Sequence, residues 1–138
     1  MEDRDTKEVW DKFYQRFTIE EFIKESLATD RWTIHHKPII DKYLSQLNKT
    51  SIFLEAGCGL GQWCYYVANN YGIQAIWVDI AEETIRKMNE YLACSKSKAK
   101  VAFICDDLNN AKLDEELADM FISLGVIEHF ADSRPMMR

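Results

Sequence analysis

Three glycines stand at alternate positions directly after a short apolar run, and they constrain the fold of this chain more than any other feature. The run Ile52–Leu54 leads into Glu-Ala-Gly-Cys-Gly-Leu-Gly at residues 55–61, and the apolar Trp63, Tyr65, Tyr66 and Val67 follow. This order predicts a buried strand, a tight turn and the start of a helix. Glycine takes positive φ and has no Cβ, so such a turn lets the backbone approach a ligand closely. The N–H groups at the helix start then face that ligand.

The spacing of the glycines disfavours two common phosphate-binding loops. A dinucleotide-binding fold needs G-x-G-x-x-G after its first strand, but the last position here is Gln62 or Cys64, depending on which glycine begins the pattern. A P-loop ends in Gly-Lys followed by Ser or Thr, whereas Gly61 is followed by Gln62 and Trp63. A polyphosphate ligand is therefore disfavoured. Two interpretations remain: the turn binds another kind of ligand, or it is a glycine turn that binds nothing.

A second apolar run, residues 73–80, carries a single acid, Asp79, near its carboxyl end. It follows the glycine turn by about 20 residues, the separation at which a βαβ unit places a carboxylate on a ribose diol. An ionised carboxylate accepts hydrogen bonds from both hydroxyls. The alternative is that Asp79 caps the helix predicted over residues 82–93, because Ala81 is a poor N-cap.

Two further apolar runs predict a third and a fourth strand. Residues 101–105 precede the acids Asp106 and Asp107. Residues 120–124 follow Asp119 and precede Gly-Val-Ile-Glu-His-Phe at 125–130. Apolar runs flanked by acids thus recur along the chain in a regular order.

In these four segments, residues 51–132 resemble the class I methyltransferases that use S-adenosylmethionine, because their motifs have the same order and spacing. The resemblance implies an α/β fold with a Rossmann-like, open and mainly parallel sheet, truncated to about four strands in the order 3-2-1-4. It implies S-adenosyl-L-methionine as cofactor, S-adenosyl-L-homocysteine as its product, and an unknown methyl acceptor, expected to be a small molecule. The methyl group is already activated, so alignment of donor and acceptor is the main catalytic requirement. A non-catalytic cofactor-binding module, or a partner subunit that uses the fold as an interaction surface, is the alternative.

The resemblance also implies roles for individual residues. The glycine turn would line the methionine part of the cofactor, Asp79 would hold the ribose, and Ile80 would pack on the adenine. Asp107 matches the acid that receives the adenine amino group better than Asp106 does, with the Leu108 backbone nearby. The residues expected to bind the cofactor are Glu55, Gly57, Cys58, Gly59, Gly61, Asp79, Ile80, Asp106, Asp107, Leu108, Leu124 and Gly125.

His129 is a candidate general base, because Glu128 is beside it and open α/β sheets bind ligands at the end of the strand that it follows. The favoured interpretation is that it caps or packs against the next segment, since the family often shows this Glu-His pair without using it as an acid or base. The catalytic residues therefore stay open. No metal site is expected, because the adjacent His35 and His36 point in different directions on a helix.

Residues 1–48 are expected to form an N-terminal helical segment that covers the cofactor and acceptor, and residues 49–138 the cofactor-binding core. Thr18-Ile19-Glu20-Glu21 fits a capping box that opens a helix through about Leu27, and a later helix is expected from Pro38 to Leu47. The aromatic residues of this segment either cover the sheet or line the acceptor pocket, and both can hold for different residues. The pocket candidates are Trp10, Tyr14, Phe17, Trp32 and His129.

Composition narrows the class of protein further. The 138 residues carry a net charge of −6 and no basic block, so charge gives no reason to expect a nucleic-acid partner. The apolar runs are far shorter than a membrane span, and the acidic start predicts no signal peptide. The four cysteines form no Cys-x-x-Cys pair, which predicts reduced thiols in a cytoplasmic protein.

By the same resemblance, the chain is expected to be an N-terminal fragment. The family's further strands continue outward from the fourth, and the helices that join them cover one face of the sheet. The segment Leu108–Ala118 is short and is not expected to replace that cover. The fourth strand, Met120–Leu124, would then have an open edge, which predicts self-association or docking of the missing C-terminal half.

Overall fold

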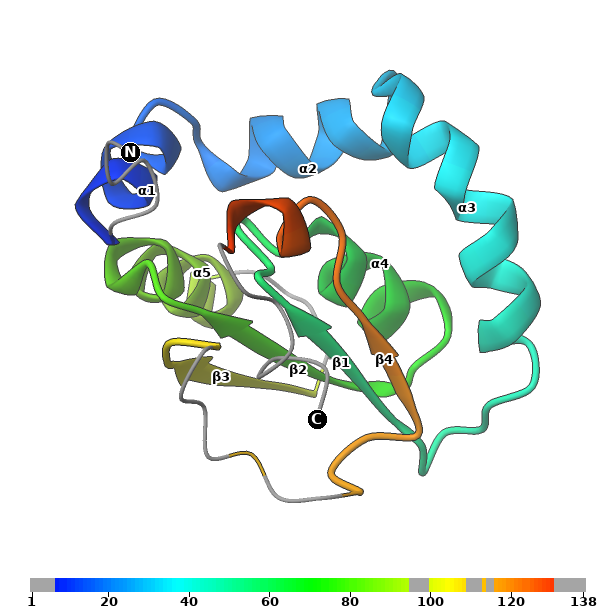
Figure 1. The fold of residues 1–138 in the computed structure, drawn as a ribbon. Coiled ribbons are helices and arrows are strands. Elements are labelled where there is room, and N and C mark those ends of the chain that lie inside the picture. Colours follow the sequence, from blue (N-terminus) through cyan, green and yellow to red (C-terminus); the bar gives the residue numbers. More distant parts are fainter. Residues whose placement is uncertain (1–6, 95–99, 109–112, 114–115, 131–138) are drawn as a thin grey trace.

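The computed structural model describes residues 7–94, 100–108, 113 and 116–130 (Figure 1). Helices pack against one side of a small sheet (Figure 1), and the order of the elements follows the sequence pattern. The elements are α1 (Lys7–Tyr14), α2 (Ile19–Ala28), α3 (Arg31–Leu44), β1 (Ile52–Ala56), α4 (Gln62–Asn70), β2 (Gln74–Asp79), α5 (Glu82–Cys94), β3 (Val101–Cys105), β4 (Met120–Ile122) and the 3-10 turn η1 (Ile127–His129).

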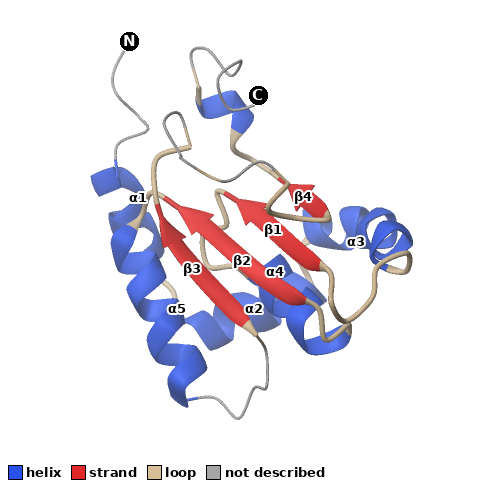
Figure 2. Ribbon diagram, turned by 90° about the horizontal axis from the view of Figure 1, so that it is seen from below, coloured by secondary structure: helices blue, strands red, loops and turns tan. Residues whose placement is uncertain are grey.

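The four strands form one parallel sheet in the order β3-β2-β1-β4, which confirms the fold predicted from the sequence. Leu54 of β1 lies beside Ile76 of β2 on one side and Phe121 of β4 on the other. Because all strands are parallel, their carboxyl ends meet at one edge, where η1 lies (Figure 2). From β1, the chain first adds β2 and β3 on one side of the sheet. It then crosses to add β4 on the other side of β1, so the strand order reverses between β1 and β4.

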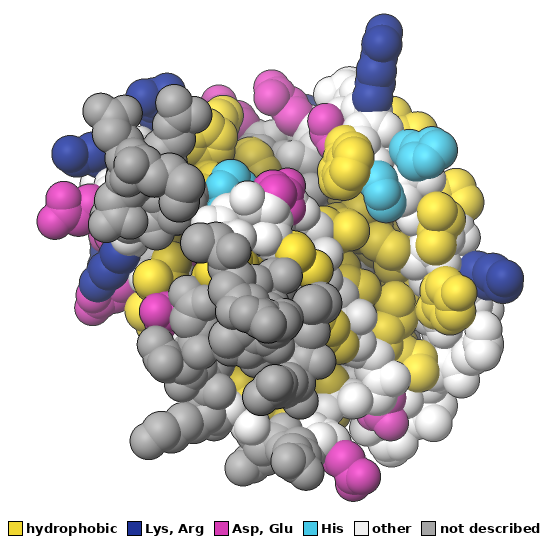
Figure 3. All heavy atoms as spheres, in the orientation of Figure 1, with side chains coloured by type: hydrophobic (Ala, Val, Ile, Leu, Met, Phe, Trp, Pro, Cys, Tyr) yellow, Lys and Arg dark blue, Asp and Glu magenta, His cyan; other side chains and the backbone are white. Residues whose placement is uncertain are grey.

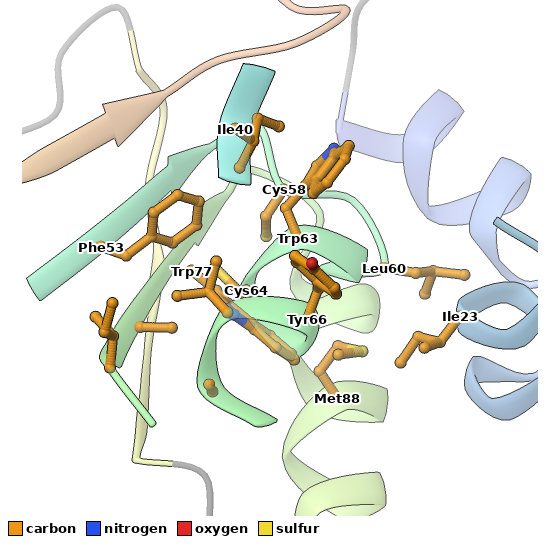
Figure 4. Packing of buried hydrophobic residues seen from close by; sticks show 14 of the residues in the cluster. Ile23, Ile40, Phe53, Cys58, Leu60, Trp63, Cys64, Tyr66, Trp77 and Met88 are labelled. Atoms are coloured by element: carbon orange, nitrogen blue, oxygen red, sulfur yellow. The ribbon is translucent and has the colours of Figure 1, made fainter. Parts of the chain in front are cut away.

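Helices α2, α3, α4 and α5 lie on one face of the sheet (Figures 1 and 2). Large buried side chains on this side include Trp77, Phe53, Trp63 and Met88, each at most 1% exposed, and they pack between the sheet and the helices (Figure 4). The Trp77 ring meets the edge of Phe103 at 4.7 Å between centroids. Burying a large apolar side chain contributes roughly 1.5–3 kcal/mol, so this cluster is the main source of stability.

On the opposite face of the sheet, described residues between β3 and β4 pack against β1 and β2. Leu54, Ile76 and Val78 are at most 5% exposed there. Side chains from this segment pack on them, including Leu108, Leu113, Leu117 and Ala118. The expectation that residues 108–118 are too short to cover this face is therefore wrong at the centre of the sheet. The side chains of Leu108, Leu113 and Leu117, which belong to loops, reach the buried residues of β1 and β2.

The edge of the sheet at β4 stays open in the described part of the chain. β4 is shorter than expected, since it ends at Ile122 instead of Leu124. Phe121 is 53% exposed, and β4 pairs only with β1. A groove of about 470 Å³ separates β4 from α3, and its walls include Ile39, Tyr43 and Phe121.

The N-terminal helices begin at side-chain caps. The Thr18 hydroxyl accepts a hydrogen bond from the Glu21 N–H (3.3 Å) and donates one to its carboxylate (2.6 Å), so the predicted helix start at Thr18 is confirmed. The predicted helix start at Pro38 is wrong. Asp30 caps α3 by accepting a hydrogen bond from the Thr33 N–H at 2.7 Å, and Pro38 lies inside the helix without an N–H to donate.

The proposed division at residues 48 and 49 remains a prediction. Ile23 and Leu44 from the N-terminal helices share one buried cluster with Phe53 of the sheet. In the described residues, no helix is both long enough and apolar enough to cross a membrane.

Asp41 attaches α3 to α4. Its Oδ1 accepts hydrogen bonds from the hydroxyls of Tyr66 and Tyr71, each at 2.7 Å, and its Oδ2 accepts one from Lys37 Nζ at 2.7 Å. The Lys37 ammonium also lies 4.7 Å from the centroid of the Tyr66 ring. Burial acts to raise the pKa of Asp41, but the hydrogen bonds from Lys37, Tyr66 and Tyr71 outweigh it and lower the pKa.

We expect Asp41→Ala to lower the free energy of unfolding by about 1–3 kcal/mol, because two tyrosine hydroxyls and one ammonium group lose a shared acceptor. Tyr71→Phe removes one of these bonds and should cost less. Urea denaturation of the three proteins measures the series. Equal stability of Asp41→Ala and wild type would show that the α3–α4 attachment depends on apolar packing alone.

Candidate cofactor site at the carboxyl edge of the sheet

Backbone hydrogen bonds fix the turn after β1. The N–H groups of Gly57 and Cys58 both donate to the Val78 carbonyl of β2, at 2.8 and 3.1 Å. The Gly61 N–H donates to the Cys58 carbonyl at 2.7 Å. Gly57, Gly59 and Gly61 have φ angles of +70°, +50° and +65°. Side chains rarely adopt these angles, so the backbone itself requires the alternating glycines.

Each of these glycines also lies where another element comes close. An added Cβ would lie 2.2 Å from Val126 Cγ2 at the first glycine, 2.3 Å from the Tyr14 hydroxyl at the second, and 3.0 Å from the Trp77 ring at the third. The turn is therefore packed between the segment after β4, helix α1 and strand β2. The missing side chains leave room for these neighbours.

Asp79 ends β2 and binds two segments at once. Its Oδ2 accepts a hydrogen bond from the Gly59 N–H (2.7 Å) and its Oδ1 accepts one from the Ala81 N–H (2.9 Å), just before α5. The side chain is buried, and burial raises the pKa of Asp79 although these N–H donors act to lower it. The Ala81 hydrogen bond is the contact expected if Asp79 caps α5, so this alternative from the sequence is present in the structure. Each oxygen keeps a further lone pair with which it can accept a hydroxyl.

Glu55 lies next to the turn, at the end of β1. It is buried, and its Oε2 accepts a hydrogen bond from the Cys64 N–H at 3.0 Å in the first turn of α4. Burial, together with the nearby charge of Asp79, raises the pKa of Glu55 to about 8. Burial also raises the pKa of the Cys58 thiol, which makes it a poor nucleophile. The turn therefore lies among acids, and a cation bound on it would be attracted.

Aromatic rings of α1 lie against the turn. The Trp10 and Tyr14 rings stack with centroids 6.0 Å apart, and His129 of η1 meets Trp10 edge to face at 5.1 Å. Burial raises the pKa of the Tyr14 hydroxyl, and the charge of Asp79 adds to this effect. Three of the predicted pocket residues, from opposite ends of the described chain, are thus brought together.

The other two pocket candidates lie elsewhere. Phe17 packs between Phe13 and Phe22, with ring centroids 5.6 and 5.5 Å away. Trp32 is 56% exposed on α3 and packs on the His36 ring at 4.2 Å. Helices α1 and α3 lie at opposite ends of α2 (Figure 1), so Trp32 is separated from the rings on α1.

The residues predicted to hold the adenine follow β2 and β3. The Asp106 N–H donates to the Asp79 carbonyl at 3.1 Å, which places Asp106 and Ile80 at the same edge. Asp106 Oδ1 accepts a hydrogen bond from the Asp107 N–H at 2.9 Å. The Leu108 side chain packs under the sheet, so its backbone is the part that can face a ligand.

The segment after β4 completes the edge. The Ser123 hydroxyl is buried and has no hydrogen-bond partner in the described part of the chain. Leu124 packs against the helix-side core and also lines the groove beside α3. Gly125 is exposed and has a φ of +72°.

Sequence reasoning missed two contacts at this edge. Val126 touches the first glycine of the turn, and Asp11 of α1 accepts a hydrogen bond from the Glu83 N–H of α5 at 3.1 Å. Both join residues far apart in the chain, and neither leaves a local signal such as a cap or a periodic pattern. Among the described residues, no cluster of His, Cys, Asp and Glu is arranged to hold a metal ion.

The fold and this edge are those of the class I Rossmann-like methyltransferases, a family that uses S-adenosyl-L-methionine. Residues 53–138 match the methyltransferase domain family, so the chain belongs to that family. The identification made from the four sequence segments is thereby confirmed.

Two curated relatives are N-methyltransferases. Ajmaline N-methyltransferase of Rauvolfia serpentina is 29% identical over 85 residues, which cover 62% of this chain and 29% of that protein. Phosphoethanolamine N-methyltransferase of Plasmodium falciparum is 28% identical over 86 residues, which cover 62% of this chain and 31% of that protein. The chain thus spans about a third of the length of the curated relatives it matches.

Solved structures share the fold. A proposed S-adenosyl-L-methionine-dependent methyltransferase of Methanococcus maripaludis aligns with a TM-score of 0.71 at 16% identity, over 96% of this chain and 56% of that one. Magnesium protoporphyrin IX methyltransferase of Synechocystis, solved with bound S-adenosylhomocysteine, aligns with a TM-score of 0.53 at 23% identity, over 76% and 50%.

The raised pKa of Glu55 predicts a pH-dependent stability. The folded chain holds a proton on Glu55 up to pH about 8, whereas the unfolded chain releases it near 4.5, so unfolding loses protons across this window. The free energy of unfolding should therefore fall as pH rises from 4.5 to about 8. Glu55→Gln should flatten this part of the profile.

Urea denaturation at several pH values within the window measures the slope, with the exposed Glu20→Gln as the matched control. Parallel profiles of wild type and Glu55→Gln would mean that Glu55 is ionised in the folded chain at neutral pH.

Proposed function

We propose that this chain binds S-adenosyl-L-methionine at the carboxyl edge of β1 and β2 and forms the cofactor-binding part of a methyltransferase. The observation that carries the proposal is the pairing of Asp79 with the glycine turn. The acid ends β2 and holds the turn after β1, beside the point where the strand order reverses between β1 and β4. Open α/β sheets bind ligands in the crevice at such a point.

The residues at this edge fit the cofactor in charge and in hydrogen bonding. Glu55 and Asp79 suit a sulfonium and an ammonium group better than a polyphosphate, because a bound cation favours the ionised form of these acids. The buried Ser123 hydroxyl needs a partner, which a ligand can provide. We assign the methionine part to the glycine turn, the ribose to Asp79, and the adenine to Ile80 and Asp107. When bound, the cofactor supplies an activated methyl group on a positively charged sulfur.

The remaining task of the chain is to position a methyl acceptor. We assign the acceptor side of the site to Trp10, Tyr14 and His129, whose rings gather against the turn. We propose a small molecule that bears an amine, because both curated relatives described above are N-methyltransferases. His129 is exposed and packs on Trp10, which suits a wall of the pocket better than a general base.

Two measurements distinguish this function from its alternatives. Calorimetry with S-adenosyl-L-homocysteine separates a chain that binds the cofactor from one that uses the fold as an interaction surface. Transfer of a labelled methyl group to a panel of small amines then separates an enzyme from a binding module without catalysis.

We also propose a cytoplasmic location, which the free state of Cys58, Cys64, Cys94 and Cys105 supports.

We further propose that a second copy of the chain covers the groove between α3 and β4. The unpaired edge of β4 offers N–H and C=O groups, and a second copy has the same edge, so the two can pair about a twofold axis. Exposed apolar side chains flank that edge, including Ile39, Tyr43 and Phe121, and apolar surface gathers over α3 in the space-filling view (Figure 3).

Asp79→Asn should weaken binding of S-adenosyl-L-homocysteine by about tenfold or more, because the ribose hydroxyls lose a charged acceptor. Calorimetry gives the affinity, and thermal unfolding shows whether the variant keeps the turn in place. Glu90→Gln, at an exposed acid further along α5, should bind like wild type. A folded Asp79→Asn protein with unchanged affinity would remove Asp79 from the ribose site.

The 138-residue chain should self-associate as its concentration rises, and Phe121→Asp should shift it toward the monomer. A charge on an edge strand opposes pairing with another strand. Ile34→Asp is the control, because Ile34 is an exposed apolar residue of α3 that does not line the groove. Light scattering across a concentration series measures the mass. A wild-type chain that stays monomeric throughout would contradict the proposal.

A further inference from the structure

Helix α1, which lies against the proposed binding site, is short and has no buried residue to hold it in place. It has only eight residues, from Lys7 to Tyr14, and none of them is fully buried. Isolated helices of this length are unstable in water, so α1 depends on its contacts with the rest of the chain to stay helical. The aromatic rings of α1 contact the glycine turn, and we call this the ring side. Its polar groups contact α5, and we call this the polar side.

The polar side has three contacts with α5. Lys7 forms an ion pair with Glu82, the Asp11 carboxylate accepts a hydrogen bond from the Glu83 N–H (3.1 Å), and Lys87 Nζ donates to the Tyr14 carbonyl (3.4 Å). The ion pair is exposed, and exposed pairs contribute little. The Lys87 contact is long. The Asp11 bond is the one that joins a charged acceptor to a backbone donor at a helix start.

Asp11 and Asp79 share the start of α5. Asp79 accepts from the Ala81 N–H and Asp11 from the Glu83 N–H, so two acids from different elements occupy the first N–H groups of one helix. A helix start stabilises negative charge, which supports both acids in one place. The position of α1 is thereby fixed to the same backbone that holds the proposed ribose acid.

We propose that Asp11 is a positioning residue that fixes α1 to the start of α5 and so holds the Tyr14 and Trp10 rings against the glycine turn. The Tyr14 hydroxyl comes close enough to the turn that a Cβ on Gly59 would lie 2.3 Å from it. A shift of α1 would move this ring and Trp10 together, since both rings belong to α1. Asp11 thus acts through α1, without contact with the acceptor or the cofactor.

A consequence follows for cofactor binding, and it rests on the proposed function. A cofactor bound at Asp79 and the turn would lie beside the α1 rings that pack on the turn, so fixing α1 would slow its release. Losing the Asp11 bond should make α1 open more often. One hydrogen bond to a charged group corresponds to about a tenfold change in such an equilibrium.

Hydrogen exchange of the whole chain tests the role of Asp11, with peptides that span residues 8–17. Three variants are compared with wild type: Asp11→Ala removes the acceptor, Asp11→Asn keeps an oxygen that can accept, and Glu8→Ala removes an exposed acid from the same helix. Stopped-flow measurement of S-adenosyl-L-homocysteine dissociation follows on each protein.

Asp11→Ala should exchange about tenfold faster in this segment and release S-adenosyl-L-homocysteine faster by a similar factor, while its thermal midpoint stays near that of wild type. Asp11→Asn should lie between wild type and Asp11→Ala, because it keeps an acceptor oxygen but loses the charge, and Glu8→Ala should behave like wild type. Wild-type exchange in Asp11→Ala overturns the proposal, and so does an Asp11→Asn protein that exchanges like Asp11→Ala. If wild type does not bind S-adenosyl-L-homocysteine, the proposed function fails, and the exchange rates still decide the role of Asp11.

Discussion

The carboxylate of Asp79 is the contact on which the carboxyl edge of the sheet depends. One oxygen holds the glycine turn and the other holds the start of α5, so a single side chain sets the distance between two backbone segments. The acid is buried and has backbone N–H groups as partners instead of a basic side chain. Such an arrangement is costly unless the carboxylate is well hydrogen-bonded, and these N–H donors meet that need.

Two buried acids lie at this edge, and neither has an ion-pair partner among the described residues. Glu55 is near the end of β1 and Asp79 ends β2; burial raises the pKa of both, and repulsion from Asp79 adds to the shift of Glu55. A bound cation would offset this repulsion and favour ionised acids. The stability of the chain and its affinity for a positively charged ligand are therefore linked through the same two side chains, and both depend on pH.

The sequence was informative wherever a residue acts within its own segment. The apolar runs located β1, β2 and β3, the Thr18 capping box located α2, and the order of the motifs indicated the strand order. Pro38 misled the placement of α3, because a proline typical of a helix start lies inside a helix whose cap is Asp30. The cover provided by residues 108–118 was also missed, since it depends on where three leucines fall in space. Asp11 could not be found for the same reason, as its partner lies 72 residues away.

Glycines in a turn of this kind can be required by ligand binding or by the packing of the protein itself, and here the packing is sufficient. Each glycine has a positive φ, and each faces a side chain from a different element, Val126, Tyr14 or Trp77. The architecture alone therefore demands all three, whether or not anything is bound. A descendant of this chain that had lost its ligand would keep the same glycines for as long as it kept its shape. If the proposed cofactor site is right, natural variants that had lost binding would differ first at Asp107 and Ser123, whose side chains the packing of the turn does not require.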